Sequence, residues 1–332
     1  RNQTLNEYSV HNNYIFNTTR TIKRNMAIFD DMDVTTIWLD GSFVDWDSAH
    51  THVLSHGLHY GVGIFEGVRC YDTVRGPAIF RWDDHLTRFY NSAKPYEMDI
   101  GYSASDLTEA TLELLRRQNL NACYIRPIAF YGYDRLGLSP VGIPVQVAIA
   151  CWPWGVYLGE EALSSGVDVM VSSWKRYSSN QVPMNAKTTG LYVNSVLASE
   201  EAHRNGFSEA ILLNTDGNVA EGAGENIFLI RDGDIYTPDL SQGVLAGITR
   251  ETIITLAREK GYTVYDEAII SEDELHSADE LFFTGTAAEV TPIKKVNETI
   301  VGKGSRGEIT KDLQSTFFDV LNRRNEAHDE WF

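Results

Sequence analysis

Hydrophobic and polar residues follow two alternating periods along the chain, and these periods predict strands and amphipathic helices in turn. Runs rich in apolar and β-branched residues predict strands at "CYIRPIAF" (123–130), "VQVAIAC" (145–151) and "VDVMVSS" (167–173). Apolar residues three or four positions apart predict an amphipathic helix through Leu86, Phe89, Tyr90 and Ala93. The mixture of both periods predicts an α/β chain.

Turn and capping signals indicate where these elements begin and end. Asp-Gly pairs predict tight hairpin turns at residues 40–41, 216–217 and 232–233. Ser103, followed by Asp106 three positions later, predicts the start of a helix. Further helices are expected from about Leu191 to Arg204, near 248 to 260 and near 308 to 325.

One stretch near the middle of the chain breaks the pattern. "WPWGVYLGEEALSSG" combines aromatic residues, Pro and Gly, and this composition indicates a domain boundary. We therefore expect a small α/β domain over residues 27–152, a linker over 153–165 and a larger domain over 166–332. Residues 1–26 are rich in Asn and Thr and carry no core pattern, so we expect them to be disordered and outside the fold.

Composition excludes several classes of partner. The 332 residues carry a net charge of -18, which repels nucleic acids and anionic membranes. Strong acidity is also compatible with adaptation to high salt. No apolar run is long enough to predict a membrane span. The cysteines are odd in number and far apart in sequence, so they predict no disulfide framework or zinc site and fit a reducing cytoplasm: Cys70, Cys123 and Cys151.

The segment "MNAKTTGLYVN" places Lys187 among small, neutral residues. An ordinary surface lysine that extends its charge into water explains this position. A partly desolvated amine explains it equally well, because burial disfavours the charged form and leaves the amine nucleophilic toward carbonyl carbon. The rest of the chain has to decide between the two interpretations.

Three other segments offer matching chemistry. "GVLAGITRETIITLARE" begins a helix near Gly247, where free N–H groups attract a phosphate. "EGAGENIF" presents Glu221 beside glycines, and "FTGTAAEV" offers a polar turn over residues 284–288. A plain helix start, a glycine bulge and an ordinary loop are the simpler explanations. Together with Lys187, however, these segments supply the lysine, the carboxylate and the phosphate cradle that pyridoxal phosphate requires.

Two alternative sites are weaker. His52, His56 and His59 have the spacing of a helical metal face, but no carboxylate or cysteine completes the set nearby, so we predict no metal. "YGVGIFEG" approaches a dinucleotide-binding fingerprint, yet Glu66 occupies the position of its last glycine.

Seven ordered segments resemble the branched-chain amino acid aminotransferases of the fold-type IV pyridoxal-phosphate group. They are "HGLHYGVGIFEGVRCYD", "YIRPIAFYGY", "WPWGVYLGEEAL", "NAKTTGLYVNS", "EGAGENIF", "LAGITRETI" and "FTGTAAEVTPI". The resemblance runs from about Ile37 to the C-terminal helix. It implies an α+β fold of two domains, with the cofactor between a small N-terminal and a larger C-terminal domain.

The resemblance also implies a role for individual residues. Lys187 is the implied catalytic residue and forms the internal aldimine with pyridoxal 5'-phosphate. Glu221 pairs with the pyridinium nitrogen, and Tyr192 bonds the phenolic oxygen. The implied phosphate contacts are Arg88, Gly247, Ile248, Thr249 and Thr286. The implied substrate-binding residues are Tyr60, Phe65, Gly67, Tyr124, Arg126, Leu138, Tyr157, Ala287 and Ala288, with Leu138 contributed by the partner subunit of a homodimer or higher oligomer.

The implied reaction is transamination of leucine, isoleucine and valine with 2-oxoglutarate by a ping-pong mechanism in the cytoplasm. Within the same fold, a D-amino acid or (R)-amine transaminase and an aminodeoxychorismate lyase are the alternatives. A ligand-binding protein that kept the fold without turnover is the alternative from another class. "GVGIFEG" with Arg69 and Arg126 favours the branched-chain group, whereas Met184, Thr188 and Thr189 depart from it and leave fine specificity open.

Overall fold

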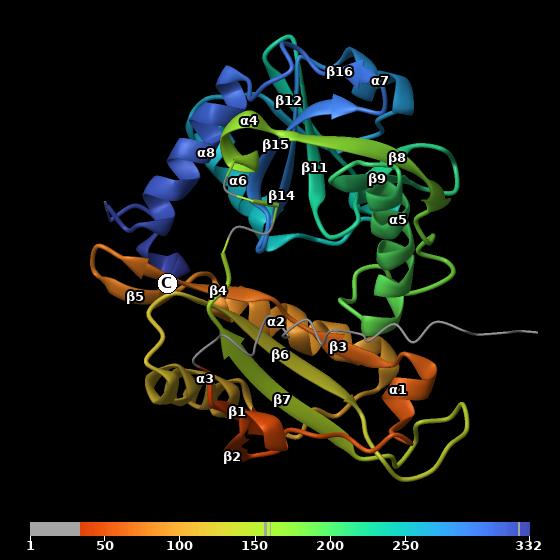
Figure 1. The fold of residues 1–332 in the computed structure, drawn as a ribbon, viewed down its shortest axis with the longest axis vertical. Coiled ribbons are helices and arrows are strands. Elements are labelled where there is room, and N and C mark those ends of the chain that lie inside the picture. Colours follow the sequence, from red (N-terminus) through yellow and green to blue (C-terminus); the bar gives the residue numbers. More distant parts are fainter. Residues whose placement is uncertain (1–33, 156–157, 160, 325) are drawn as a thin grey trace, which may run out of the picture. The chain divides into compact units, whose positions relative to one another are not determined.

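The computed structural model describes residues 34–155, 158–159, 161–324 and 326–332. Residues 1–26, predicted to be disordered, lie outside this range. The described chain forms two β-sheets with helices packed against them (Figure 1). All strands of the first sheet fall between residues 36 and 152, and all strands of the second between 167 and 300. The division into a small domain, a linker and a large domain stays a prediction.

The first sheet is antiparallel throughout and has the order β2-β1-β7-β6-β4-β5, with β3 also paired to β6. Its strands are β1 Thr36–Leu39, β2 Ser42–Asp45, β3 Gly63–Phe65, β4 Val68–Thr73, β5 Gly76–Ile79, β6 Cys123–Tyr131 and β7 Val145–Trp152. The predicted strands at 123–130 and 145–151 are therefore confirmed as β6 and β7. The turn at Asp40-Gly41 is confirmed too, since both residues adopt the positive φ angles that a tight hairpin turn requires.

Helices α1 His56–Tyr60, α2 Trp82–Ala93 and α3 Ala104–Gln118 accompany this sheet. Phe89 of α2 and Leu107 of α3 are fully buried in one core with Ile125 and Ile149 of the sheet. The predicted start of α3 is confirmed by a capping box, in which the Asp106 N–H donates to Ser103 Oγ at 3.2 Å and the Ser103 N–H donates to Asp106 Oδ2 at 2.8 Å.

The second sheet is mixed, with the order β10-β9-β8-β15-β14-β11-β12-β13 and with β16 paired to β15. Its strands are β8 Val167–Lys175, β9 Glu209–Leu213, β10 Val219–Gly222, β11 Asn226–Arg231, β12 Asp234–Pro238, β13 Val264–Ala268, β14 Glu280–Gly285, β15 Glu289–Val296 and β16 Thr299–Ile300. The predicted hairpin turns at 216–217 and 232–233 join β9 to β10 and β11 to β12.

Helices cover both faces of the second sheet (Figure 1). They are α4 Ala162–Ser165, α5 Tyr192–Arg204, α6 Ile248–Glu259, α7 Glu272–Ser277 and α8 Glu308–Leu321. Phe317 of α8 and Ile253 of α6 share a buried core with Phe228 and Phe282, whose rings stack at 4.9 Å. The predicted end of the last helix at 325 is wrong: α8 ends at Leu321, because Arg323 adopts a left-handed conformation that stops a helix.

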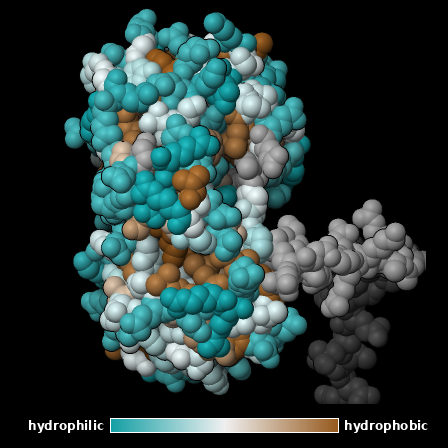
Figure 2. Space-filling view, turned by 90° about the vertical axis from the view of Figure 1, so that its left-hand side faces the viewer, coloured by the Kyte–Doolittle hydropathy of each residue, from teal (hydrophilic) through white to brown (hydrophobic). Residues whose placement is uncertain are grey.

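The surface and the cysteines fit the composition. Hydrophilic residues cover most of the face seen in Figure 2, as the charge of -18 requires. Among the described residues, no helix combines the length and the apolar character needed to cross a bilayer. The three cysteines lie on neighbouring strands of the first sheet, and all of them are buried and form no disulfide: Cys70, Cys123 and Cys151.

Candidate active site

A cavity of about 210 Å³ collects residues from both sheets. Its walls come from β3, Gly67, α2 and β6 on one side and from the Lys187 segment, α5, β10, β11, α6 and the β14–β15 turn on the other. The predicted residues that line it are Phe65, Gly67, Arg88, Tyr124, Arg126, Lys187, Tyr192, Glu221, Gly247, Ile248, Thr249, Thr286 and Ala287. Segments that are far apart in sequence therefore meet at one place.

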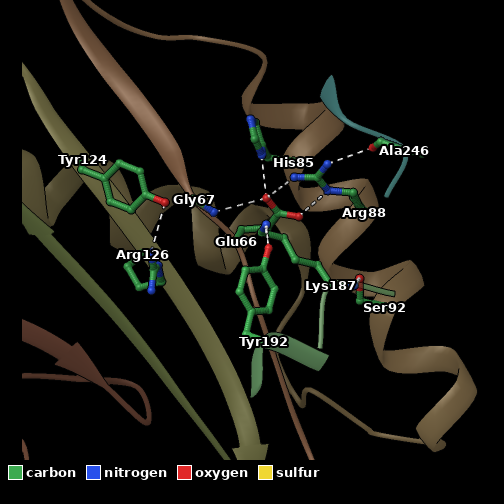
Figure 3. A network of polar contacts seen from close by, with 10 residues as sticks. All are labelled: Glu66, Gly67, His85, Arg88, Ser92, Tyr124, Arg126, Lys187, Tyr192 and Ala246. Carbon is green, nitrogen blue, oxygen red and sulfur yellow. Dashed lines mark hydrogen bonds and ion pairs between the residues drawn. The ribbon is translucent and has the colours of Figure 1, made fainter. Parts of the chain in front are cut away.

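Lys187 lies in this cavity on a well-anchored backbone. Its N–H donates to Ser92 Oγ at 2.9 Å, and its C=O accepts from the Phe65 N–H at 3.1 Å. The half-buried amine donates to Tyr192 Oη at 2.5 Å and has no carboxylate partner among the described residues (Figure 3). This geometry favours the desolvated amine over a solvated surface lysine, because the amine faces the rings of Phe65 and Tyr192 and the hydroxyl of Tyr192.

Glu221 is buried in the wall of the same cavity. Its Oε1 pairs with Arg176 Nη2 at 2.5 Å, and its Oε2 accepts from Asn226 Nδ2 and from the Leu245 N–H, both at 3.1 Å. Burial raises the pKa of Glu221, and the guanidinium of Arg176 opposes this effect. Three donors around one carboxylate can thus stabilise the charge that burial disfavours.

Arg88 is held by a buried carboxylate. Its Nε and Nη2 donate to the two oxygens of Glu66 at 2.7 and 2.9 Å, and its Nη1 donates to the Ala246 C=O at 2.9 Å (Figure 3). His85 Nδ1 lies 2.6 Å from Glu66 Oε2. Burial alone would raise the pKa of Glu66, but Arg88 and His85 together hold it far below its usual range. The guanidinium is therefore fixed beside the start of α6.

The start of α6 is an open anion site. Gly247 is its N-cap and carries no capping side chain, and among the described residues the N–H groups of Gly247, Ile248 and Thr249 donate no hydrogen bond. A Cβ on Gly247 would lie 1.9 Å from Asn226 Oδ1, so a larger residue does not fit. Thr284 Oγ1 is buried in the same cavity and has no partner among the described residues. These free donors and the helix dipole suit a phosphate.

Tyr124 and Arg126 point from one face of β6, two positions apart. Arg126 Nη2 donates to Tyr124 Oη at 3.1 Å, and the guanidinium lies over the rings of Phe65 at 4.8 Å and of Tyr124 at 5.2 Å (Figure 3). A Cβ on Gly67 would lie 1.8 Å from Tyr124 Oη, so the glycine makes room for this hydroxyl. Arg126 Nε is buried without a partner among the described residues. Arg126 is therefore a cation that lies beside the rings of Phe65 and Tyr124 and has no ion-pair partner among the described residues.

Comparisons with known proteins decide the family. The family model described as "Amino-transferase class IV" matches residues 63–296. The chain belongs to the class IV aminotransferases. It is 50% identical over 295 residues to a branched-chain-amino-acid aminotransferase of Pseudomonas aeruginosa, covering 89% of this chain and 95% of that protein. Identity to the corresponding protein of Escherichia coli strain K12 is 45% over 296 residues, with the same coverage.

Solved structures of this family show the same fold. The crystal structure of the Escherichia coli branched-chain amino acid aminotransferase superposes with a TM-score of 0.88 at 44% identity, covering 90% of this chain and 98% of that one. The T.th. branched-chain amino acid aminotransferase, solved with pyridoxamine 5'-phosphate, gives 0.86 at 45% identity, covering 90% and 97%. The fold-type IV architecture expected from the sequence is therefore confirmed.

Three substrate-site residues expected from the family resemblance, namely Tyr60, Leu138 and Ala288, do not line the cavity. Tyr60 is 39% exposed and its ring lies 4.6 Å from the His56 ring, tilted by 49°, and Leu138 is 84% exposed on the β6–β7 connection. Ala288 is buried in the β14–β15 turn, and Tyr157 lies outside the described residues. Their roles stay predictions. The histidines considered for a metal have other partners: His56 Nε2 contacts the Gly137 C=O and His59 Nε2 the Val53 C=O.

Several aminotransferase site residues were missed from the sequence. Arg176 follows β8 in a polar segment without any distinguishing pattern, and Trp154 lines the cavity 4.5 Å from the Tyr124 ring. Glu225 also lines the cavity. Its pKa lies well above the usual range, mainly because the group is buried and also because the charge of Glu209 is nearby. Only Glu66 gave a signal, since a glutamate inside the apolar run "GVGIFEGV" needs a buried partner.

Proposed function

We propose that this enzyme transaminates leucine, isoleucine and valine with 2-oxoglutarate, using pyridoxal 5'-phosphate. The observation that carries the proposal is the Lys187 amine, which lies 2.5 Å from Tyr192 Oη in a cavity that also holds a carboxylate and an open helix start. The names of the relatives support the substrate class. Two structures of the T.th. enzyme carry N-(5'-phosphopyridoxyl)-L-glutamate and 4-methylvaleric acid, one mimic for each kind of substrate.

The residues of the cavity fit the cofactor. Lys187 supplies the attaching amine, Tyr192 a donor for the phenolic oxygen and Glu221 an anionic partner for the ring nitrogen. Arg88, Thr286 and the N–H groups that begin α6 supply the phosphate contacts. The unpartnered buried Thr284 hydroxyl is an observation that a polar ligand would explain. When bound, the cofactor supplies an electron sink for the α-carbon of the substrate.

The chain's own residues then divide the remaining tasks. Arg176 favours the ionised form of Glu221 against the effect of burial, and an ionised Glu221 can stabilise a protonated ring nitrogen. With the cofactor and an amino acid bound, the free Lys187 amine would take the proton from the substrate Cα as general base and would return a proton as general acid. Because an amino group is left on the enzyme between the two substrates, the kinetics are ping-pong.

The substrate side of the cavity suits two different side chains. Phe65 and Tyr192 offer apolar surface to leucine, isoleucine and valine, and the family resemblance adds Tyr60 to this pocket. Tyr124 and the N–H groups of the Ala287–Ala288 turn receive the α-carboxylate. Arg126, which retains donors, meets the second carboxylate of glutamate or 2-oxoglutarate.

A leucine assay tests this function. The purified enzyme should absorb visible light, lose that absorbance on treatment with borohydride, and form glutamate from L-leucine and 2-oxoglutarate. D-Leucine and 3-methylbutan-1-amine should react far more slowly, which separates the proposal from the D-amino acid and (R)-amine alternatives. A coloured protein that turns over none of the L-amino acids would contradict it.

We further propose that the enzyme is a homodimer in the cytoplasm. Large apolar side chains are exposed on α1, on the β6–β7 connection and on α5, all on the right-hand side of Figure 1: Leu58, Leu138, Val193 and Val196. Surface of this kind is typical of an interface. The free, buried cysteines fit a reducing compartment.

Light scattering should give twice the chain mass of 37.3 kDa. Val196→Glu should shift the mass toward the monomer, because it would bury a carboxylate in the interface. The exposed Lys303→Glu variant is the control. A monomeric wild-type enzyme would contradict the proposal.

A further inference from the structure

Arg69 makes an unusual set of contacts behind the β14–β15 turn. Its Nε donates to the Thr286 C=O at 3.0 Å and its Nη2 to the Ala287 C=O at 3.2 Å. The same guanidinium donates to the carbonyls of Trp154 at 3.4 Å and Gly155 at 2.9 Å. Among the described residues it forms no ion pair with a carboxylate. One planar group thus binds four backbone carbonyls from two segments.

These contacts fix the direction of two peptide units. In a trans peptide unit the C=O and the following N–H point in opposite directions. Binding the carbonyls of Thr286 and Ala287 to Arg69 therefore turns the N–H groups of Ala287 and Ala288 away from Arg69. Arg69 does not line the cavity, whereas Thr286 and Ala287 do, so the N–H groups face the cavity side.

The turn is fixed at its other end as well. Thr291 Oγ1 donates to the Ala288 C=O at 2.7 Å, so all three carbonyls of residues 286–288 are bound by side chains. Among the described residues, the N–H groups of Ala287 and Ala288 donate no hydrogen bond. A pair of fixed, unpaired donors is a preorganised anion site.

We propose that Arg69 is a positioning residue that holds the β14–β15 turn in the conformation that binds the substrate α-carboxylate. Arg69 is paired in register with Tyr124, the second expected contact of that carboxylate. By also binding the carbonyls of residues 154 and 155, Arg69 couples this turn to the segment that carries Trp154. The inference rests on the proposed transamination, since it concerns the carboxylate that leucine and glutamate share.

Arg69→Met tests the inference, because it keeps the apolar stem and removes all five donors. Single-turnover rate constants should fall about 10- to 100-fold for L-leucine and L-glutamate alike, a loss of the size expected for charge-assisted hydrogen bonds. The rate constant for 3-methylbutan-1-amine, which has the leucine side chain without the carboxylate, should change less than about threefold. Calorimetric binding of 4-methylvaleric acid to the holoenzyme should weaken by the same factor as the leucine reaction.

Two further variants separate positioning from charge and from general disruption. Arg69→Lys keeps the charge but loses the fork that reaches several carbonyls, so it should remain at least tenfold impaired toward leucine. Arg75→Met, in the turn between β4 and β5 on the same hairpin, should match the wild type.

An equal loss for leucine and the amine, or full activity of Arg69→Lys, would overturn the inference. Absence of leucine turnover in the wild-type holoenzyme would instead overturn the proposed function, so the two failures are distinguishable.

Discussion

Lys187→Ala should lower the steady-state transamination of leucine by about 10,000-fold or more, the upper range for loss of a general acid–base group. The variant loses both the covalent attachment of the cofactor and the base that takes the α-proton. No other described residue can replace it, because the remaining cavity-lining cations are arginines, which stay protonated. Arg88 and Arg176 are, in addition, already paired with Glu66 and Glu221.

The loss should be chemical and not structural. The Lys187 segment is held through its backbone, by Ser92 Oγ and the Phe65 N–H, and by the bridge between Ile64 and Thr188. None of these contacts uses the side chain. The phosphate donors of α6 and Arg88 also remain, so the variant should still bind the cofactor without covalent attachment.

Borohydride reduction followed by mass spectrometry measures the attachment directly. The wild type should retain the cofactor mass on the peptide that contains Lys187, and the variant should not. Lys303→Ala, which removes an exposed lysine that does not line the cavity, is the matched control. Steady-state turnover of Lys187→Ala within tenfold of the wild type would refute the assignment.

Local signals made much of the fold predictable. The capping box at Ser103 and the Asp-Gly turns act within four residues, so the sequence contains the whole interaction. The strand β6 was predictable because its alternation of buried and half-buried residues follows the pleat. The end of α8 was not, since the left-handed Arg323 has no residue-specific preference that predicts it.

The residues of the site also fall into a group that local sequence predicts and a group that it does not. Lys187, Glu221 and the start of α6 each lie in a short contiguous segment, and these segments carry the family resemblance. Arg69 and Thr286 are 217 residues apart in sequence, and Arg88 and Ala246 are 158 apart. Contacts of that kind depend on how the two sheets meet, which periodicity does not describe. Supporting residues such as Arg176 are therefore visible only in the structure.

Arg126→Met should separate the two half-reactions of the enzyme. Leucine and glutamate share one cavity, and a purely apolar wall would leave the glutamate side-chain carboxylate without partners, at a cost of several kcal/mol. Arg126 resolves this conflict, because aromatic rings cover its guanidinium and it retains an unpartnered Nε among the described residues. Leucine can pack beside the group, whereas a carboxylate can pair with it.

The methionine substitution keeps the bulk against Phe65 and Tyr124 and removes the charge. We expect the activation free energy of the glutamate half-reaction to rise by about 2 to 4 kcal/mol, the cost of losing a charge-assisted contact at a partly buried site. The activation free energy of the leucine half-reaction should rise by less than about 1 kcal/mol, since a volume-conserving apolar replacement disturbs packing little. Single-turnover kinetics with each amino acid measure both values in the same preparation, and the exposed Arg116→Met variant controls for a general loss of positive charge. An equal loss for the two amino acids would show that Arg126 serves the α-carboxylate or the fold, because leucine and glutamate differ only beyond the α-carbon.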